Sequence, residues 1–566
     1  MQHHPPAAHN MHIHQLKKTP HSIQNNRSHL IRLIPPVIID PKPMPSQTSS
    51  TAQARIASAL LLVLTLLWCI YWFVHARHYW EDDAYIHLEF ARSLAAGLGF
   101  AFNGRVVAGD TAPLWVFLLA ATHSLIPGWL AAGKLLTVLG AALSLAGLYA
   151  FARRLATSLL PPSPDAALFP AAILLLVVVN PYTCYWIFSG MEPLAASGLA
   201  FFAVLAATQT HPSTKTLLAA CLLAGIMPLL RPEMIFLSAL LLLPLFAQWR
   251  RLPGNPSSPS KLAAFASALF LVATPVLLWS LYSLRAFGHL LPNTNAAKRA
   301  AHADSVVRHL LSIYAAGFPL ILCGLIAGIL YLILRPAAVR RSLQYAVSAA
   351  FNPTTPTAAR PTPTLPLAGW IFLLWPLIAT LFYIANHTYV QTRYILVTAP
   401  ALTLVILVLA LQSAPRAARF VYLAALAASL AISLITVRPL IRNKAIDCQT
   451  TKDLALFIHD HIPPGAPVAD YAIGEIAFFS QHPILDTSGI TRPDAVPYLN
   501  APPTAMILWA RSQGARYWIG NRPTPDSILI YSVNQSFATW SLHPALYASS
   551  NRIELWQLPA STDRPR

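Results

Sequence analysis

The sequence predicts a mainly α, polytopic membrane helical bundle with a small C-terminal α/β domain. Hydrophobic residues make up 55% of the 566 residues and charged residues only 10%, and the mean hydropathy is +0.52. These values lie outside the range of soluble domains. Long apolar runs recur up to residue 437, and shorter, mixed patterns follow them. We therefore expect a membrane module followed by a module of soluble type.

Eleven apolar runs are predicted to cross the membrane. The first, 56–74, matches a hydrocarbon core of about 30 Å. It follows about 55 polar residues and precedes no small-residue cleavage site, which indicates an anchor rather than a signal peptide. The segment 113–126 is too short to span comfortably and is predicted to be interfacial or re-entrant. The eleven runs are 56–75, 129–151, 166–183, 193–209, 216–230, 233–248, 262–287, 311–334, 366–385, 394–412 and 417–437.

The charge distribution predicts the orientation. Of the 39 basic and 20 acidic residues, ten of each lie in 441–566, so the whole net charge of +19 belongs to residues 1–440. The basic clusters share one side of the membrane if the N-terminus is cytoplasmic, as the positive-inside rule requires. They are Arg55, Arg153–Arg154, Lys215, Arg250–Arg251, Lys261, Arg340–Arg341, Arg416 and Arg419. No soluble basic face is visible, which argues against a nucleic-acid partner.

Three domains are expected. Residues 1–50 are rich in His, Pro and Asn and are predicted to be a disordered cytoplasmic tail. Residues 51–440 form the transmembrane module. Residues 441–566 form an α/β domain of about 120 residues, which an odd number of spans places on the outer side of the membrane. Its predicted strands are 467–471, 483–487, 516–519 and 553–558, and its predicted helices are 451–461 and 503–513.

Acidic residues concentrate on the predicted outer side. Eight of the ten acids before residue 441 fall there, and five of them lie in 81–110. Charge beside a bilayer is costly and usually functional. Asp82 and Asp83 open a predicted helix over 84–96. One Asp would be explained as a helix cap, but two, preceded by Glu81, favour a catalytic or acceptor-binding role. Asp82 is slightly preferred as the general base.

Other outer segments add candidate ligands. Glu192 precedes Pro193 at a helix junction, where it could cap the helix or serve a site. Arg231 and Glu233 interrupt two apolar runs, either as an internal salt bridge or as the lining of a cavity. Outer cations suit an anionic ligand such as a phosphate, although an arginine there could also snorkel. The predicted acceptor- or donor-binding residues are Glu192, Arg231, Glu233, Asn293, Lys298, Arg299, His387, Arg393 and Tyr394.

Several motifs occur in a fixed order between about residues 56 and 495. They are DDAYIHLEFARSLAAGLGFAFNG, TAPLW, SGMEP, RPE, LPNTNAAKRA, the Arg393-Tyr394 step and GEIAFFSQHPILDTSGI. This ordered set resembles bacterial GT-C glycosyltransferases, and most of all the group that includes the mycobacterial terminal arabinofuranosyltransferase. Where such relatives often read GYTNPLW, this chain has GDTAPLW at 109–115, a departure that bears on acceptor specificity.

The resemblance implies an inverting transferase that takes a sugar from a polyprenyl-phosphate donor on the periplasmic face. The family's acidic motif matches Asp82 and Asp83, and its Asn-rich loop matches Asn293 and Lys298. The residue types fit this chemistry, because an attacking sugar hydroxyl needs a carboxylate base and a leaving lipid phosphate needs cations. The acceptor would be an envelope glycan, lipid or protein.

No cofactor is required by the sequence, and a divalent cation is compatible with the paired acids. The five cysteines form no CxxC pair and are predicted to be small buried hydrophobic residues. The alternative function, a polytopic transporter or lipid flippase, would predict inverted repeats and acids at the bilayer midplane. A non-enzymatic scaffold would not need paired acids beside outer cations.

Overall fold

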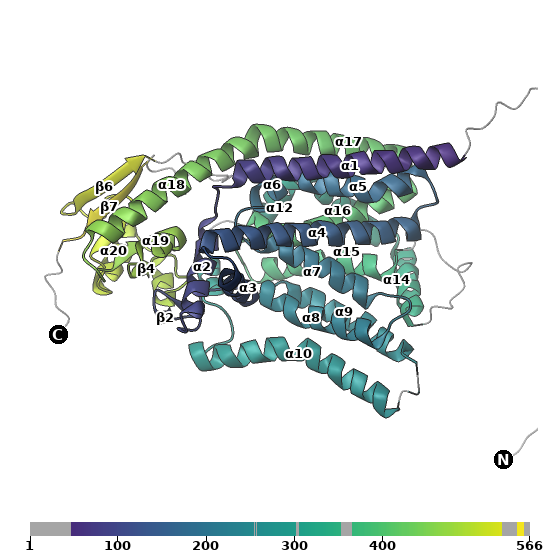
Figure 1. Ribbon diagram of the computed structural model, residues 1–566, viewed down its shortest axis with the longest axis horizontal. Coiled ribbons are helices and arrows are strands. Elements are labelled where there is room, and N and C mark those ends of the chain that lie inside the picture. Colours follow the sequence, from purple (N-terminus) through teal and green to yellow (C-terminus); the bar gives the residue numbers. More distant parts are fainter. Residues whose placement is uncertain are drawn as a thin grey trace, which may run out of the picture. The chain divides into compact units, whose positions relative to one another are not determined.

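The computed structural model describes residues 47–253, 255, 257–300, 305–351, 365–534 and 552–559. The predicted tail 1–50 therefore lies almost entirely outside the described residues. The described residues from Ser50 onward cluster as one unit. Its architecture is a bundle of long helices, with a small sheet near the C-terminus (Figure 1).

The prediction of a polytopic helical bundle is confirmed, and all eleven expected apolar runs fall on helices. Seven helical segments are long and apolar enough to cross a membrane within the described part of the chain: Ala52–Ala76, Trp129–Leu159, Met234–Arg251, Pro259–Phe287, Leu367–Ala385, Thr392–Ser413 and Pro415–His461. Shorter apolar helices are α3 (Pro113–Leu125), α5 (Pro164–Val178), α7 (Pro193–Ala207) and α8 (Thr214–Leu230). The exact number of spans stays a prediction.

The helices that form these segments, and the shorter helices that connect them, have the following bounds. The bundle contains α1 (Gln47–Ala76), α2 (Asp82–Ala95), α4 (Trp129–Leu159), α6 (Pro181–Trp186), α9 (Met234–Arg251), α10 (Pro259–Phe287), α11 (Thr294–Ala300), α12 (Val306–Gly317), α13 (Pro319–Leu334), α14 (Pro336–Phe351), α15 (Leu367–Ala385), α16 (Thr392–Ser413) and α17 (Pro415–Ile432). A two-stranded hairpin, β1 (Ala101–Phe102) with β2 (Arg105–Val106), follows α2.

Small residues let α4 and α7 approach closely. A Cβ added at Gly140 would lie 2.9 Å from the Cβ of Ala195, and one at Gly198 would lie 2.7 Å from the backbone nitrogen of Ser144. In a membrane, close helix contact relies on packing and on small residues at the interface. Because α7 starts at Pro193, this packing also fixes the position of Glu192 at its N-terminus.

The C-terminal residues form a five-stranded sheet in the order β4-β3-β5-β7-β6. β3 (Val468–Asp470) pairs in parallel with β4 (Ile484–Asp486) and with β5 (Tyr517–Ile519), whereas β7 (Arg552–Gln557) is antiparallel to β5 and to β6 (Ile528–Asn534). The four predicted strands are present, and β6 was not predicted. The helices are α19 (Ile473–Ser480), η3 (Pro493–Tyr498) and α20 (Pro503–Ser512).

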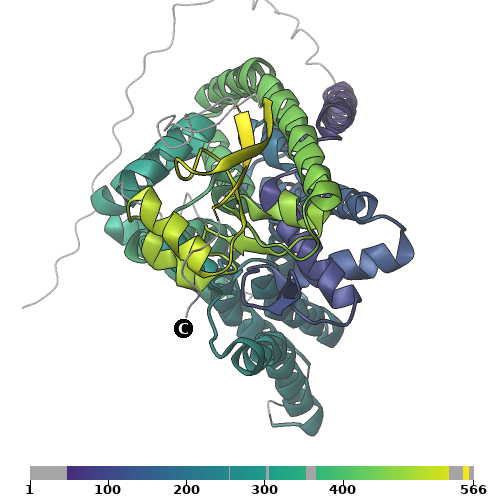
Figure 2. The same ribbon diagram turned by 90° about the vertical axis from the view of Figure 1, so that its left-hand side faces the viewer.

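The predicted helix 451–461 is the end of a much longer one. The π-helical segment η2 (Ser433–Val437) joins α17 to α18 (Arg438–His461) without a break. This continuous helix leads from the bundle to the sheet, as Figure 1 shows, and Figure 2 shows the C-terminal elements lying over one end of the bundle. α19 packs against α2, so the C-terminal elements contact the acidic segment directly.

Candidate active site

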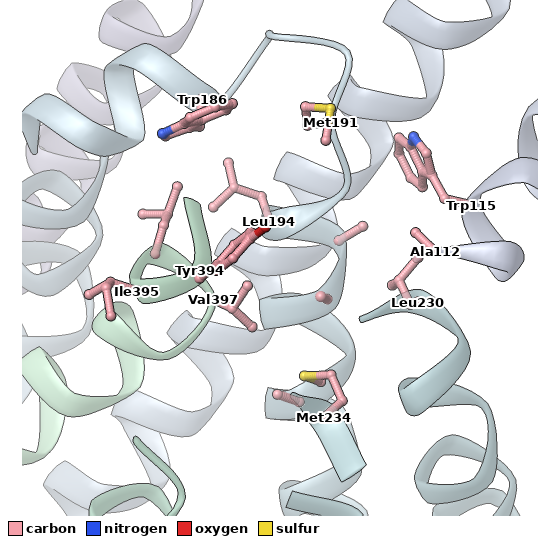
Figure 3. Packing of buried hydrophobic residues seen from close by; sticks show 14 of the residues in the cluster. Ala112, Trp115, Trp186, Met191, Leu194, Leu230, Met234, Tyr394, Ile395 and Val397 are labelled. Atoms are coloured by element: carbon pink, nitrogen blue, oxygen red, sulfur yellow. The ribbon is translucent and has the colours of Figure 1, made fainter. Parts of the chain in front are cut away.

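A pocket lies where α2, the segment before α3, the loop before α7 and the start of α16 meet α11. Its lining is Asp83, Ile86, His87, Gly109, Asp110, Thr111, Met191, Glu192, Arg231, Thr294, Lys298, Arg393, Tyr394 and Ile490. Buried apolar side chains surround this region, among them Trp115, Trp186, Met191 and Leu194 (Figure 3). The lining combines carboxylates and cations that lie far apart in the sequence, as a site for a charged ligand requires.

Three cations of the lining lie close to the ring of Tyr394. Arg393 forms an ion pair with Asp83, and Lys298 donates a hydrogen bond to the hydroxyl of Tyr394. The guanidinium of Arg231 lies 4.6 Å from the centre of the Tyr394 ring. Burial alone would raise the pKa of Asp83, but Arg393 and Lys298 outweigh burial and hold that pKa below its usual value. Asp83 is therefore a carboxylate at neutral pH.

Arg393 carries unused hydrogen-bonding capacity. The residue is only 3% exposed, yet its Nε and Nη1 have no hydrogen-bond partner among the residues that the structure describes. Leaving a buried donor unpaired is costly, and more so for a charged group. A guanidinium with two free N–H directions beside a pocket is suited to an oxyanion ligand, because its donors match carboxylate and phosphate oxygens.

A row of alternating charges, separate from the Asp83–Arg393 pair, is centred on His87. Its Nδ1 lies 2.5 Å from Oδ2 of Asp110, and its Nε2 lies 3.3 Å from Oε2 of Glu192. Burial would lower the pKa of His87, but the two carboxylates raise it to about 10, so the ring is an imidazolium at neutral pH. Burial would likewise raise the pKa of Glu192, and Arg231 with His87 reverses that effect and lowers it.

Arg231 completes this row. Its Nη1 lies 2.6 Å from Oε1 of Glu192, and its Nη2 lies 2.7 Å from Oε1 of Glu233. The sequence left open whether Arg231 and Glu233 form an internal salt bridge or line a cavity. The structure shows the salt bridge for the pair, and Arg231 lines the pocket as well. The paired charges fix Glu192 and Arg231 in place.

Asp82, which the sequence slightly favoured as the general base, is not among the residues that line this pocket. Its carboxylate accepts hydrogen bonds from the backbone N–H groups of Gly474 (3.1 Å) and Glu475 (2.8 Å) in the first turn of α19. Burial, with the neighbouring Asp83, raises the pKa of Asp82 to about 6 although these donors favour the charged form. Asp82 thus caps a helix, but one that lies almost 400 residues further along the chain.

The other predicted ligands separate into three groups. Glu192, Arg231, Lys298, Arg393 and Tyr394 line the pocket. Glu233 and Asn293 are buried outside the lining. Glu233 forms an ion pair with Arg231, and the backbone N–H of Asn293 donates to the carbonyl of Ala108 (2.9 Å). Arg299 and His387 are exposed and are not part of the lining.

Sequence reasoning missed three parts of the site. His87 lies four residues after Asp83, so one turn of helix brings both to the same face, a spacing that could have identified it. Asp110 was counted among the outer acids and noted as a departure from GYTNPLW, but it was not assigned to the site. Lys134 on α4 donates to the carbonyls of Tyr79 and Phe188, both at 2.5 Å, and so ties together the loops that lead into α2 and α7. No sequence pattern pointed to Lys134.

A resident metal site is not evident. Groups of three or more His, Cys, Asp and Glu side chains placed to hold a metal ion do not occur in the described ranges. The carboxylates of the pocket are instead matched by Arg393, His87 and Arg231.

Comparisons with known proteins bear on the fold. A family model described as a domain of unknown function (DUF8728) matches residues 441–562, and no curated protein matches the chain. The chain is similar to the solved structure of ArnT from Cupriavidus metallidurans bound to undecaprenyl phosphate, with a TM-score of 0.51 and 14% identity over 90% of this chain and 99% of that one. The apo state of that ArnT gives a TM-score of 0.49 at 14% identity over 91% and 100% of the two chains.

The likeness extends to the fold, which is of the GT-C type. It supports the predicted architecture over almost the whole chain. It does not support the narrower resemblance to the mycobacterial arabinofuranosyltransferase group.

Proposed function

We propose that this protein is a membrane glycosyltransferase that moves a sugar from a polyprenyl-phosphate donor to an envelope acceptor on the periplasmic face. The observation that carries the proposal is the buried guanidinium of Arg393, whose Nε and Nη1 have no hydrogen-bond partner among the described residues, in the lining of a pocket shared with Lys298 and Arg231. Such a group fits a phosphate. The fold is shared with an ArnT that binds undecaprenyl phosphate, which agrees with this ligand.

The reaction follows from the two kinds of charge. The oxygen of an acceptor hydroxyl attacks the anomeric carbon of the sugar, its proton passes to a carboxylate, and the bond from that carbon to the donor phosphate oxygen breaks. The electron pair of the broken bond stays on the polyprenyl phosphate, where Arg393 and Lys298 stabilise the added charge. A single displacement of this kind inverts the anomeric centre.

Asp83 is the carboxylate that we assign as the base. It lines the pocket and is ionised, while Asp82 is engaged by α19. Asp83 is paired with Arg393. A donor phosphate would compete for that guanidinium, so donor binding would release the Asp83 carboxylate to accept a proton.

Lipid binding tests the phosphate site directly. Purified protein in nanodiscs should bind undecaprenyl phosphate at least tenfold more tightly than undecaprenol, which has the same tail and no phosphate. Arg393→Gln and Lys298→Gln should each reduce that preference, because a charged hydrogen bond contributes about 1.5–3 kcal/mol. Native mass spectrometry measures both ligands.

Arg419→Gln is a suitable control, since Arg419 is an exposed arginine paired with Asp165. It should leave the preference unchanged. Equal binding of the phosphate and the alcohol by the unmodified protein would overturn the proposed function. Unchanged binding in both pocket variants, with folding intact, would show that these cations only anchor the protein at the interface.

A further inference from the structure

We propose that the loop after β4, residues 487–491, forms the wall of the pocket that selects the donor sugar, and that Asp486 is the positioning residue that holds this wall. The inference rests on the proposed function and assigns a part in it to the C-terminal residues. Ile490 lines the pocket together with Asp83, Lys298 and Arg393. The region that sequence analysis treated as a separate domain therefore contributes directly to the site.

Asp486 fixes the conformation of the loop. Its side chain is fully buried at the end of β4. One carboxylate oxygen accepts from the N–H and the hydroxyl of Ser488, at 2.7 and 2.6 Å, and the other accepts from the N–H and the hydroxyl of Thr491, at 2.5 and 3.0 Å. Both oxygens are used fully, so the two residues that flank Gly489 and Ile490 are held by one carboxylate.

The loop is wedged between two other walls of the pocket. A Cβ added at Gly109 would lie 2.9 Å from Cγ2 of Thr491 and 3.4 Å from the carbonyl oxygen of Ile490. On the other side, a Cβ at Gly489, which has φ +82°, would lie 3.5 Å from the Cβ of Ala297, the neighbour of Lys298. These contacts leave little freedom for the loop to move as a unit.

The chemistry of the wall points to the sugar. The sugar is bonded directly to the phosphate, so a group that shares a small pocket with Arg393 and Lys298 lies within reach of the sugar ring. The hydroxyls of Ser488 and Thr491 are turned toward Asp486, and Ile490 presents an apolar side chain. A wall of this kind limits the size of a substituent and disfavours a polar one, because no donor or acceptor compensates the lost hydration.

Donor ranking tests the proposal. The probes are undecaprenyl-phosphate pentose, undecaprenyl-phosphate hexose and undecaprenyl phosphate, measured by native mass spectrometry without acceptor. Ile490→Ala should shift the hexose-to-pentose affinity ratio about tenfold toward the larger sugar, the scale on which a few methylene groups act in a pocket. Affinity for undecaprenyl phosphate should stay within about twofold of the unmodified protein, since that ligand lacks the sugar.

Asp486→Asn should shift the same ratio, because an amide nitrogen cannot accept from one of the two loop residues. Asp494→Asn is the matched control, as Asp494 is an exposed carboxylate in η3, paired with Arg492, in the same part of the chain. An unchanged ratio in Ile490→Ala, with undecaprenyl phosphate still bound, would overturn the proposal and would leave the proposed function intact. Failure of the unmodified protein to bind undecaprenyl phosphate would overturn the proposed function instead.

Discussion

At the scale of single residues, the paired aspartates act in different places. Successive residues on an α-helix point about 100° apart, because 3.6 residues complete a turn. Asp82 and Asp83 are the first two residues of α2, so one carboxylate reaches α19 and the other reaches the pocket. The sequence predicted a functional acidic pair, and it could not distinguish the two members because the partner of Asp82 lies in residues 474–475.

Replacing each aspartate with asparagine should separate these roles. Asp83→Asn should lower the rate of undecaprenyl phosphate release from the sugar-linked donor by at least about 100-fold, the usual effect of removing a general base. Asp82→Asn should keep turnover within about tenfold and lower the stability by about 1 kcal/mol, since it loses one accepted hydrogen bond. Turnover and the thermal unfolding midpoint of both variants measure this. Near-normal turnover in Asp83→Asn would move the base to Glu192.

The histidine that was missed gives a pH-dependent prediction. The pKa of His87 is raised from 6.5 to about 10 in the folded protein. Its contribution to stability is therefore fully present below pH 6.5 and is lost as the pH rises through 10, because the folded state holds the proton more tightly. His87→Gln should lower stability at pH 7 by about 3 kcal/mol, as removal of one partner of a buried ion pair does.

The difference in unfolding midpoint between the unmodified protein and His87→Gln should shrink steadily between pH 7 and pH 10. His289→Gln, at an exposed histidine, should show no such trend. A difference that is constant with pH would mean that His87 is neutral and only fills space.

At the scale of secondary structure, close approach of α2 and α19 depends on Gly474. A Cβ at this position would lie 2.0 Å from the carbonyl oxygen of Asp82, and a carbon–oxygen contact this short is not possible without a shift of the backbone. Gly474→Ala should therefore push α19 away from α2, break the hydrogen bonds by which Asp82 caps α19, and lower the unfolding midpoint of the protein. It should also reduce turnover, because Asp83 belongs to the displaced turn. Gly514→Ala, in open space with φ +91°, carries only the backbone cost of about 1–2 kcal/mol. A smaller loss of stability in Gly474→Ala than in Gly514→Ala would refute this account.

The elements themselves were predictable where they have a local cause. The apolar runs gave the helices, and α3 starts at Pro113, where a proline is favoured. β6 was not predicted although its sequence, ILIYSVN, is rich in apolar and β-branched residues that favour strands, and it lies at the edge of the sheet. The site was only partly predictable, since Ile490 joins Lys298 and Asp83 through tertiary packing that leaves no periodic trace in the sequence.

At the scale of the whole molecule, the basic residues mark one end of the bundle. Arg154, near the end of α4, donates to the carbonyls of Leu205 and Thr208 at the end of α7, and Lys261 donates to the carbonyls of Arg250 and Leu252 after α9. Cations at helix C-termini satisfy free carbonyls and complement the helix dipole. Lys134, near the start of α4, binds the loops beside the pocket. α4 has 31 residues and is therefore about 46 Å long, which is long enough to separate the basic end from the pocket by a hydrocarbon core of about 30 Å.

The positive-inside rule then predicts that the basic end is cytoplasmic and the pocket periplasmic. Alkaline phosphatase reports this, because its disulfides form only in an oxidising compartment. A fusion after Arg566 should be active, and one at Arg250, at the end of α9, should be silent at equal expression. The reverse pattern would put the pocket in the cytoplasm, and no periplasmic acceptor could then reach Asp83. Two active fusions would mean that the number of spans between residues 250 and 441 differs from the predicted five, since two positions on the same side of the membrane are separated by an even number of crossings.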